Sequence, residues 1–250
     1  MAIALILGAA DVACGPPEPF VSKHVLELHA DGSIHCDGLQ IHVAGDDTRA
    51  LRSHLHEVAS EMPVAPIFPD HPAGPKSPNG RLDLRIDMVW PCSALLRAIE
   101  ACMQPGIQIW NLRILTTTSG VAGRSISLEL PRDIGASQCR SDIAGHPIRV
   151  RIRASSEPGG TARLAYTVSC PIDWGPDESD PSAIIYENHD ARDSSDLKRK
   201  LAAQHVKWPE RGVEMDPAAD LRFAQLLETI DLGFQIGFSR VSIGLAEIKQ

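Results

Sequence analysis

Two kinds of apolar periodicity alternate along this chain, and their order constrains the fold more than any other feature. In residues 24–30 and 107–115, apolar side chains recur at every second position, which is the period of a strand with one buried face. In residues 48–62 and 93–104 they recur every three or four positions, which is typical of an amphipathic helix. Because the two periods alternate, we expect a mixed α+β fold in which helices pack on sheets.

The first half of the chain predicts the element order β-β-α-β-α-β. Asp31-Gly32 is a strong hairpin signal, and Pro63 ends the first helix because proline cannot continue the hydrogen-bond ladder. The prolines of residues 63–80 indicate an irregular surface loop, and Pro105-Gly106 ends the second helix. The predicted elements are a strand over 24–30, a partner strand over 33–35 that continues over 39–43 after a second turn at Asp37-Gly38, a helix over 48–62, a strand over 82–86, a helix over 93–104 and a strand over 107–115.

The second half repeats this order. The predicted elements are strands over 147–153 and 163–169, a helix capped by Ser195 or Asp196, a short strand that approaches Asp216, a helix that opens at Asp216-Pro217 and ends at Gly233, and a strand over 234–245. The tetrapeptide Gly106-Ile107-Gln108-Ile109 corresponds to Gly233-Phe234-Gln235-Ile236. Each tetrapeptide follows a helix whose preceding strand stops at an aspartate, Asp87 or Asp216.

These patterns together predict a duplication, with two tandem two-layer β-β-α-β-α-β modules. The first module covers residues 24–117 and the second covers residues 146–250. Residues 118–145 are expected to form a flexible linker between them. Residues 1–23 hold a short apolar stretch and a proline-rich linker.

The apolar stretch at residues 2–10 has two interpretations. With Cys14 and the prolines that follow, it resembles the end of a secretory or lipoprotein leader, with a lipid anchor at Cys14. No positive charge precedes it, however, and Asp11 stands where a lipoprotein leader has an aliphatic residue. The alternative is a first buried strand. In either case the stretch is shorter than the roughly 20 residues that a membrane-spanning helix needs.

Charge and composition exclude some partners. The formal net charge is −8, which disfavours nucleic acid, since such proteins present a basic surface. Arg149, Arg151 and Arg153 alternate with apolar residues, so a half-exposed strand is favoured over a phosphate-binding row. Aromatic residues make up only 4% of the chain, and the cores are therefore expected to be aliphatic.

The cysteines and histidines predict no metal site and no cofactor. Six cysteines are present without a CxxC pair, which is the spacing that metal clusters commonly show. His54 and His56 lie two apart on a helix and therefore point in different directions. Only a particular strand register would bring the remaining candidates together, which are His29, His35, Cys36 and His42.

No sequence motif indicates catalysis. A Gly-x-Ser-x-Gly elbow is missing, and the glycine-rich residues 120–125 lack the lysine of a phosphate-binding loop. Asp87 and Asp216 end strands, where α/β proteins often place ligand groups, although Asp216 before Pro217 is favoured as a helix cap. Trp90 is either an interaction anchor or a lid over the core. The candidate binding residues are Asp87, Trp90, Gln108, Asp216 and Gln235.

The element order and four segments resemble the periplasmic domain of the ExbD/TolR family of biopolymer-transport proteins. The segments are LELHADGSIHCDGLQI (26–41), TRALRSHLHEVA (48–59), LDLRID (82–87) and LLRAIEACMQPGIQIWNLRI (95–114). The resemblance implies a periplasmic or cell-envelope protein whose partners are envelope proteins such as a motor complex. The chain departs from the family because it lacks the transmembrane helix with its aspartate, and because residues 63–80 are inserted.

Three functions follow from these observations. The favoured one is a non-enzymatic binding or scaffolding protein in which the paired modules form an intramolecular pseudo-dimer and bind partners at sheet edges. The second is an enzyme whose site assembles between the modules from a set such as His35, Arg85 and Asp87. The third is a cytosolic partner-binding protein, which free thiols on all six cysteines would favour.

Overall fold

The computed structural model describes residues 20–42, 47–66, 73–118, 121–130, 146–155, 163–174 and 184–244. Within them the chain forms three sheets and four helices, which confirms the mixed α+β class. The first half contains β1 (Phe20–Leu28), β2 (Ile34–Cys36), β3 (Leu39–His42), α1 (Arg49–Ser60), β4 (Val64–Pro66), β5 (Lys76–Pro78), β6 (Gly80–Asp87), α2 (Ser93–Met103), β7 (Asn111–Thr118) and β8 (Val121–Glu129). The second half contains β9 (Ile148–Ser155), β10 (Arg163–Trp174), β11 (Ile184–Ala191), α3 (Ser194–Lys207), β12 (Val213–Pro217), α4 (Phe223–Ile236) and β13 (Val241–Ile243).

The two large sheets have the same connectivity. The first has the order β3-β2-β1-β6-β7-β8, and β1, β6 and β7 are parallel. The second has the order β11-β10-β9-β12-β13, and β9, β12 and β13 are parallel. In each half, three antiparallel strands lead to a helix, a central strand, a second helix and a further parallel strand. Strand β8 and the β4-β5 hairpin have no counterpart among the described residues of the second half.

Each half buries a core between its helices and one face of its sheet. Most core side chains are aliphatic, as the low aromatic content predicted, although the second half also buries Phe223 and Phe238. In the first half the core side chains alternate along the strands and recur along the helices, and they include Leu26, Leu84, Leu112, Leu51, Leu55 and Ile99. In the second half they include Val150, Val168, Met215, Leu197, Leu226 and Ile230. Burial of this apolar surface is the main force that holds the helices on the sheets.

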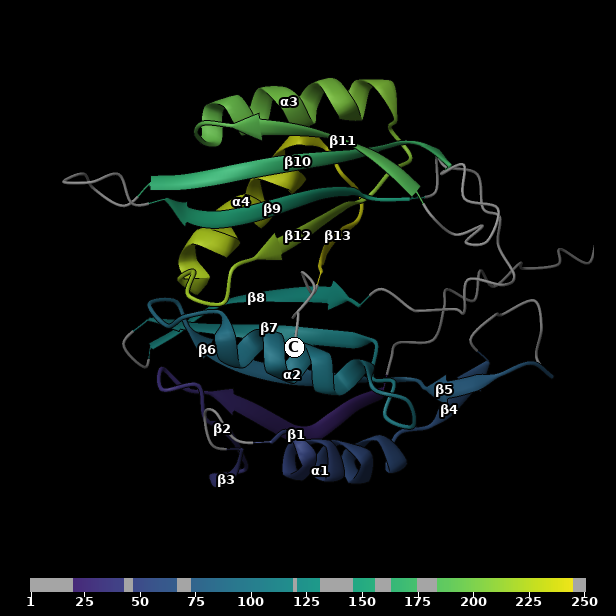
Figure 1. Cartoon of the computed structure of the whole chain (residues 1–250). Helices are drawn as coiled ribbons and strands as arrows, with labels where there is room; N and C mark the ends of the chain where they lie inside the picture. Colours follow the sequence, from purple (N-terminus) through teal and green to yellow (C-terminus); the bar gives the residue numbers. More distant parts are fainter. Residues whose placement is uncertain are drawn as a thin grey trace, which may run out of the picture.

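The halves meet through the connections that lead from each central strand to the following helix. Cys92 N donates to the carbonyl of Leu221 at 2.8 Å, and Phe223 N donates to the carbonyl of Trp90 at the same distance. Strand β8 also lies next to β13, so the halves stack edge to edge (Figure 1). In this view α2 lies in front of the first sheet and α4 behind the second.

The end of α4 corrects the predicted repeat. Helix α4 passes through Gly233 and ends at Gly237, whose φ of 111° is the left-handed conformation that glycine adopts easily. Gly233 permits close packing instead, since a Cβ there would lie 3.3 Å from the Val241 side chain and 3.4 Å from that of Met215. Gln235 is therefore helical, and the tetrapeptide at Gly106 has no structural counterpart at Gly233. The predicted strand over 234–245 shortens to β13.

The start of α4 is a second correction. Asp216 and Pro217 lie within β12, and the helix begins only at Phe223. Gln225 caps it, because its side-chain oxygen accepts a hydrogen bond from Arg222 N at 3.1 Å. Asp216 is therefore not the helix cap that the proline suggested.

Some segments predicted as irregular are strands. Residues 121–129 form β8, which pairs with β7, so the flexible-linker prediction for 118–145 is wrong over this stretch. The β4-β5 hairpin lies in the predicted loop over 63–80, and β11 was missed. Phe20 to Lys23, predicted as linker, belong to β1. Residues 1–19, with both interpretations of the apolar stretch, lie outside the described residues.

Candidate binding pocket

A pocket of about 450 Å³ opens at the edge where the parallel strands β1, β6 and β7 all end. Carboxyl ends of parallel strands are a common place for ligand groups, because the loops that follow them diverge there. Side chains from these strands, from the connection before α2 and from β8 line it. They are Glu27, Leu28, His29, Arg85, Asp87, Trp90, Thr117 and Ala122, and we call this site the Trp90 pocket.

Asp87 is buried, lines the Trp90 pocket and stabilises the local backbone. Its Oδ1 accepts a hydrogen bond from Val89 N at 3.1 Å, and its Oδ2 accepts one from the Thr117 hydroxyl at 3.3 Å. The first bond forms the Asx-turn that the sequence allowed as one interpretation of this residue. The carboxylate thereby shapes the turn that carries Trp90.

Trp90 lies half-buried between the core and the pocket. Its ring stacks on that of His29, with centroids 5.5 Å apart and planes 23° apart, and His29 in turn contacts the ring of His35 at 4.2 Å. Its backbone carbonyl accepts the bond from Phe223 of the other half. The indole therefore packs on the core, as the lid interpretation predicted, and also lines the pocket.

An ion pair sits at the rim of the Trp90 pocket. Arg85 Nη1 lies 2.5 Å from Glu27 Oε1, and the two side chains are 48% and 33% exposed. Both residues project from adjacent strands on the face opposite the helices, where Glu27 is directly paired with Arg85. The pair is neutral as a whole and adds hydrogen-bonding groups to the rim, and Asp87 is the remaining carboxylate of the pocket lining.

The described residues of the pocket do not form a catalytic triad. Asp87 and Thr117 bond to each other, and Nε2 of His29 has no hydrogen-bond partner among the described residues. Of the set suggested for an enzyme, Arg85 and Asp87 line the pocket, while His35 packs against His29. The geometry suits binding through an aromatic surface and polar rim.

The other predicted binding residues lie elsewhere. Gln108, with a φ of 52°, lies in the connection between α2 and β7, and Gln235 lies on α4. Asp216 is buried on β12, and desolvation raises its pKa although Arg149 and Arg151 act in the opposite direction. The structure thus brings together Asp87 and Trp90 but not the remaining three. The arginine row on β9 is a half-exposed strand as predicted.

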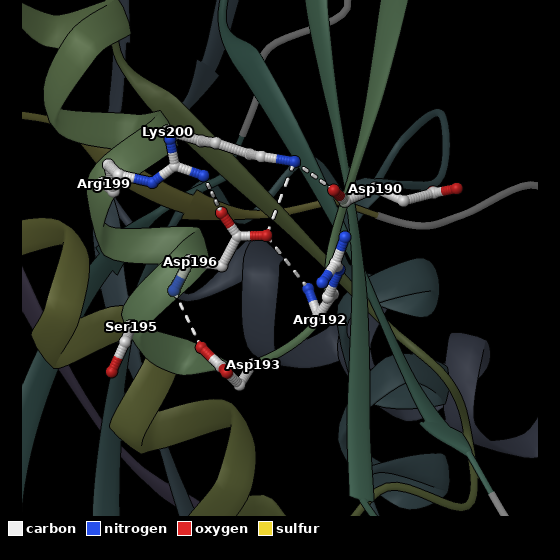
Figure 2. A pocket seen from close by; sticks show the side chains of 7 residues that line it. All are labelled: Asp190, Arg192, Asp193, Ser195, Asp196, Arg199 and Lys200. Carbon is white, nitrogen blue, oxygen red and sulfur yellow. Dashed lines mark hydrogen bonds and ion pairs between the residues drawn. The ribbon is translucent and has the colours of Figure 1, made fainter.

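A second pocket of about 580 Å³ lies at the start of α3 and is lined mostly by charged side chains, three of which form ion pairs with one another. Figure 2 shows the Asp196 carboxylate between Arg199 and Lys200, with contacts of 2.5 and 3.6 Å. Asp193, rather than Ser195 or Asp196, caps the helix by accepting a bond from Asp196 N at 2.8 Å. These charges form an exposed helix cap.

A third grouping, of His24, Cys36 and His54, joins three elements, and sequence spacing did not reveal it. The available signal was the hairpin register that could bring His29, His35, Cys36 and His42 together, and in the structure Cys36 meets His24 and His54 instead.

Comparisons of the chain with protein-family models, with curated proteins and with solved structures find no match. Among the described residues, no helix has the length and apolar character needed to span a membrane.

Proposed function

We propose that this protein is a non-enzymatic binding or scaffolding protein, built as an intramolecular pseudo-dimer of two modules similar to the periplasmic domain of ExbD/TolR proteins. The observation that carries the proposal is the shared connectivity of the two sheets. Their contact through equivalent connections, Met88 to Cys92 and Leu221 to Ala224, supports it, because like surfaces meet in a two-fold dimer.

The binding mode that we propose differs from the sheet-edge pairing expected from the sequence. Strands β8 and β13, which close the two sheets, lie next to each other at the centre of the molecule. We therefore propose partner binding at the Trp90 pocket, which holds an indole and an ion pair, and next to which in the chain Val89 is exposed. Rigid aromatic side chains with a polar rim are typical of protein-binding sites.

The compartment and the partners rest on the family resemblance alone, which favours a cell-envelope protein that binds a motor complex. A cytosolic partner-binding protein is the second candidate, which free thiols on all six cysteines would favour. Cys36, Cys92, Cys102 and Cys170 are free and buried. Titration of the thiols in the denatured, unreduced protein distinguishes the two, since six free thiols indicate a reducing compartment.

Site-specific photo-crosslinking in the native host tests the binding site. A photoreactive amino acid at Val89, which is 59% exposed beside Trp90, should yield a discrete crosslinked product whose partner mass spectrometry identifies. The same amino acid at Val206, which is 84% exposed on α3, is the control. Trp90→Ala should remove the product at position 89. Identical products at both positions, or none, would reject the Trp90 pocket as the binding site.

A further inference from the structure

Three ligand-type side chains converge where α1 packs on the first hairpin. His24 lies on β1, Cys36 on β2 and His54 on α1, and one ligand atom of each lies within 4.8 Å of the others. Strand register explains the convergence, because Cys36 pairs with Leu26 and His24 lies two residues before Leu26 on the same face. His54 borders the buried stripe of α1 formed by Leu51, Leu55 and Val58.

The surroundings of both histidines leave a ring nitrogen available to a cation. His24 Nδ1 lies 2.7 Å from Asp37 Oδ2 and donates to it, so its Nε2 carries the lone pair. His54 Nδ1 lies 3.9 Å from Glu57 Oε2, and its Nε2 is buried with no hydrogen-bond partner among the described residues. A carboxylate on the far nitrogen is how proteins commonly orient a metal-binding imidazole.

Glu61 is the candidate for a fourth ligand: it approaches His24, although it is not one of the three residues whose ligand atoms all lie within 4.8 Å of one another. Its Oε2 lies 3.6 Å from His24 Nε2, close to the roughly 3.3 Å that separates two ligands of a tetrahedral zinc ion with bonds of about 2.0–2.1 Å. Lys23 holds the same carboxylate at 3.0 Å. A thiolate and a carboxylate together would balance the charge of a divalent cation, so the loaded site would be neutral.

We propose that His24, Cys36 and His54, with Glu61, bind a zinc-class divalent cation, and that Asp37 positions His24. Two imidazoles with a thiolate suit Zn²⁺ and Co²⁺, whereas Mg²⁺ and Ca²⁺ require mainly oxygen ligands. Because four protein ligands close the coordination shell, the site is structural and fastens α1 to the β1-β2 hairpin. The proposal is independent of the binding function assigned to the Trp90 pocket.

Cobalt titration of the untagged, full-length, chelator-treated protein tests the site. One equivalent of Co²⁺ should produce a thiolate-to-cobalt charge-transfer band and the visible bands of tetrahedral cobalt, and Zn²⁺ should displace both. Cys36→Ser should abolish the charge-transfer band. His24→Gln and His54→Gln should each weaken binding by more than about 100-fold, and Asp37→Asn by about 10- to 100-fold.

His56→Gln is the matched control, because His56 is exposed on the same helix two residues from His54. It should leave the affinity unchanged. Zn²⁺ should also raise the melting temperature of the wild type but not that of His54→Gln, since a ligand stabilises only the state that binds it. Because His54 is partly exposed, His54→Gln should fold even if Cys36→Ser does not, and it then tests the site on its own. Circular dichroism shows whether each variant is folded. Absence of the charge-transfer band, or equal affinity in His54→Gln and His56→Gln, would overturn the proposal.

Discussion

Strands β6 and β12 occupy equivalent places in their sheets, and each carries a buried aspartate near its end, but the two carboxylates have different surroundings. Asp87 is paired in register with Thr117 of β7, whose hydroxyl donates to it. Asp216 lies next to Met215, which pairs with Ile243, so that Gly244 stands beside it without a side chain. A Cβ on Gly244 would lie only 2.1 Å from Asp216 Oδ1, and this oxygen has no hydrogen-bond partner among the described residues.

Thr117 lies beside Asp87, whereas Gly244 lies beside Asp216. Two sheets with the same connectivity can therefore place equivalent aspartates in different chemical surroundings. Burial of Asp87 is compensated by two donors. Burial raises the pKa of Asp216. Burial also raises the pKa of Glu214 on the same strand, and the nearby charge of Asp216 raises it further. One acid stabilises a turn of the Trp90 pocket, and the other is a buried charge that arginines on β9 only partly offset.

The largest expected effect tests whether the two halves unfold together. Leu84→Ala on β6 and Met215→Ala on β12 each remove a fully buried side chain and should lower the free energy of unfolding by about 3 kcal/mol. Because backbone hydrogen bonds join the halves, both variants should shift one common transition in urea, followed by circular dichroism and tryptophan fluorescence. Two separate transitions, each moved by only one variant, would show that the halves are independent.

The acid of the first half should be stabilising. Asp87→Ala leaves Val89 N and the Thr117 hydroxyl without their acceptor, so the free energy of unfolding should fall by about 2 kcal/mol. Urea unfolding at neutral pH measures it. Asp220→Ala, in the exposed connection before α4, serves as the control and should change little. An equal loss of unfolding free energy in Asp87→Ala and Asp220→Ala would show that the two hydrogen bonds of Asp87 do not stabilise the protein.

Replacing Asp216, the buried acid of the second half, should change the free energy of unfolding in the opposite direction. Asp216→Asn removes a buried charge with an unpaired oxygen and should stabilise the protein at neutral pH by about 1 kcal/mol. A carboxyl with a raised folded-state pKa binds protons more tightly in the folded state, so wild-type stability falls as pH rises above the ordinary value of 3.8. The gain in the variant should therefore shrink as pH falls toward 3.8. Urea titrations at several pH values measure this, and a loss of stability at neutral pH would contradict it.

The smallest effect concerns the ion pair between the halves. Arg124 of β8 contacts Asp231 of α4 through two bonds of 2.5 and 2.9 Å, but the arginine side chain is 60% exposed. A double-mutant cycle with Arg124→Ala and Asp231→Ala should give a coupling energy of about 0.5 kcal/mol that decreases with added salt. A salt-independent coupling of several kcal/mol would show that this pair, rather than the backbone bonds, joins the halves.

Local periodicity was sufficient to predict an element wherever its structure depends only on its own stretch of chain. The stripe Leu51, Leu55 and Val58 predicted α1, and the alternation around Val150 predicted the exposed arginines of β9. Asp87 and Trp90 were found because a turn at the end of a strand is a local feature, and the structure places both in one pocket.

Contacts between distant residues decided the rest, because periodicity contains no information about which segments meet. Gly233 has the sequence features of a helix end, but it lies inside α4, where Val241 and Met215 pack closely against it. Pairing with β7 makes residues 121–129 a strand, although Gly120 and Gly123 suggest a linker. His24, Cys36 and His54 meet only because a strand register and a helix orientation bring them together. The sequence by itself determined the four helices and the parallel strands between them. The tertiary structure determined the further strands β4, β5, β8 and β11 and which side chains became neighbours.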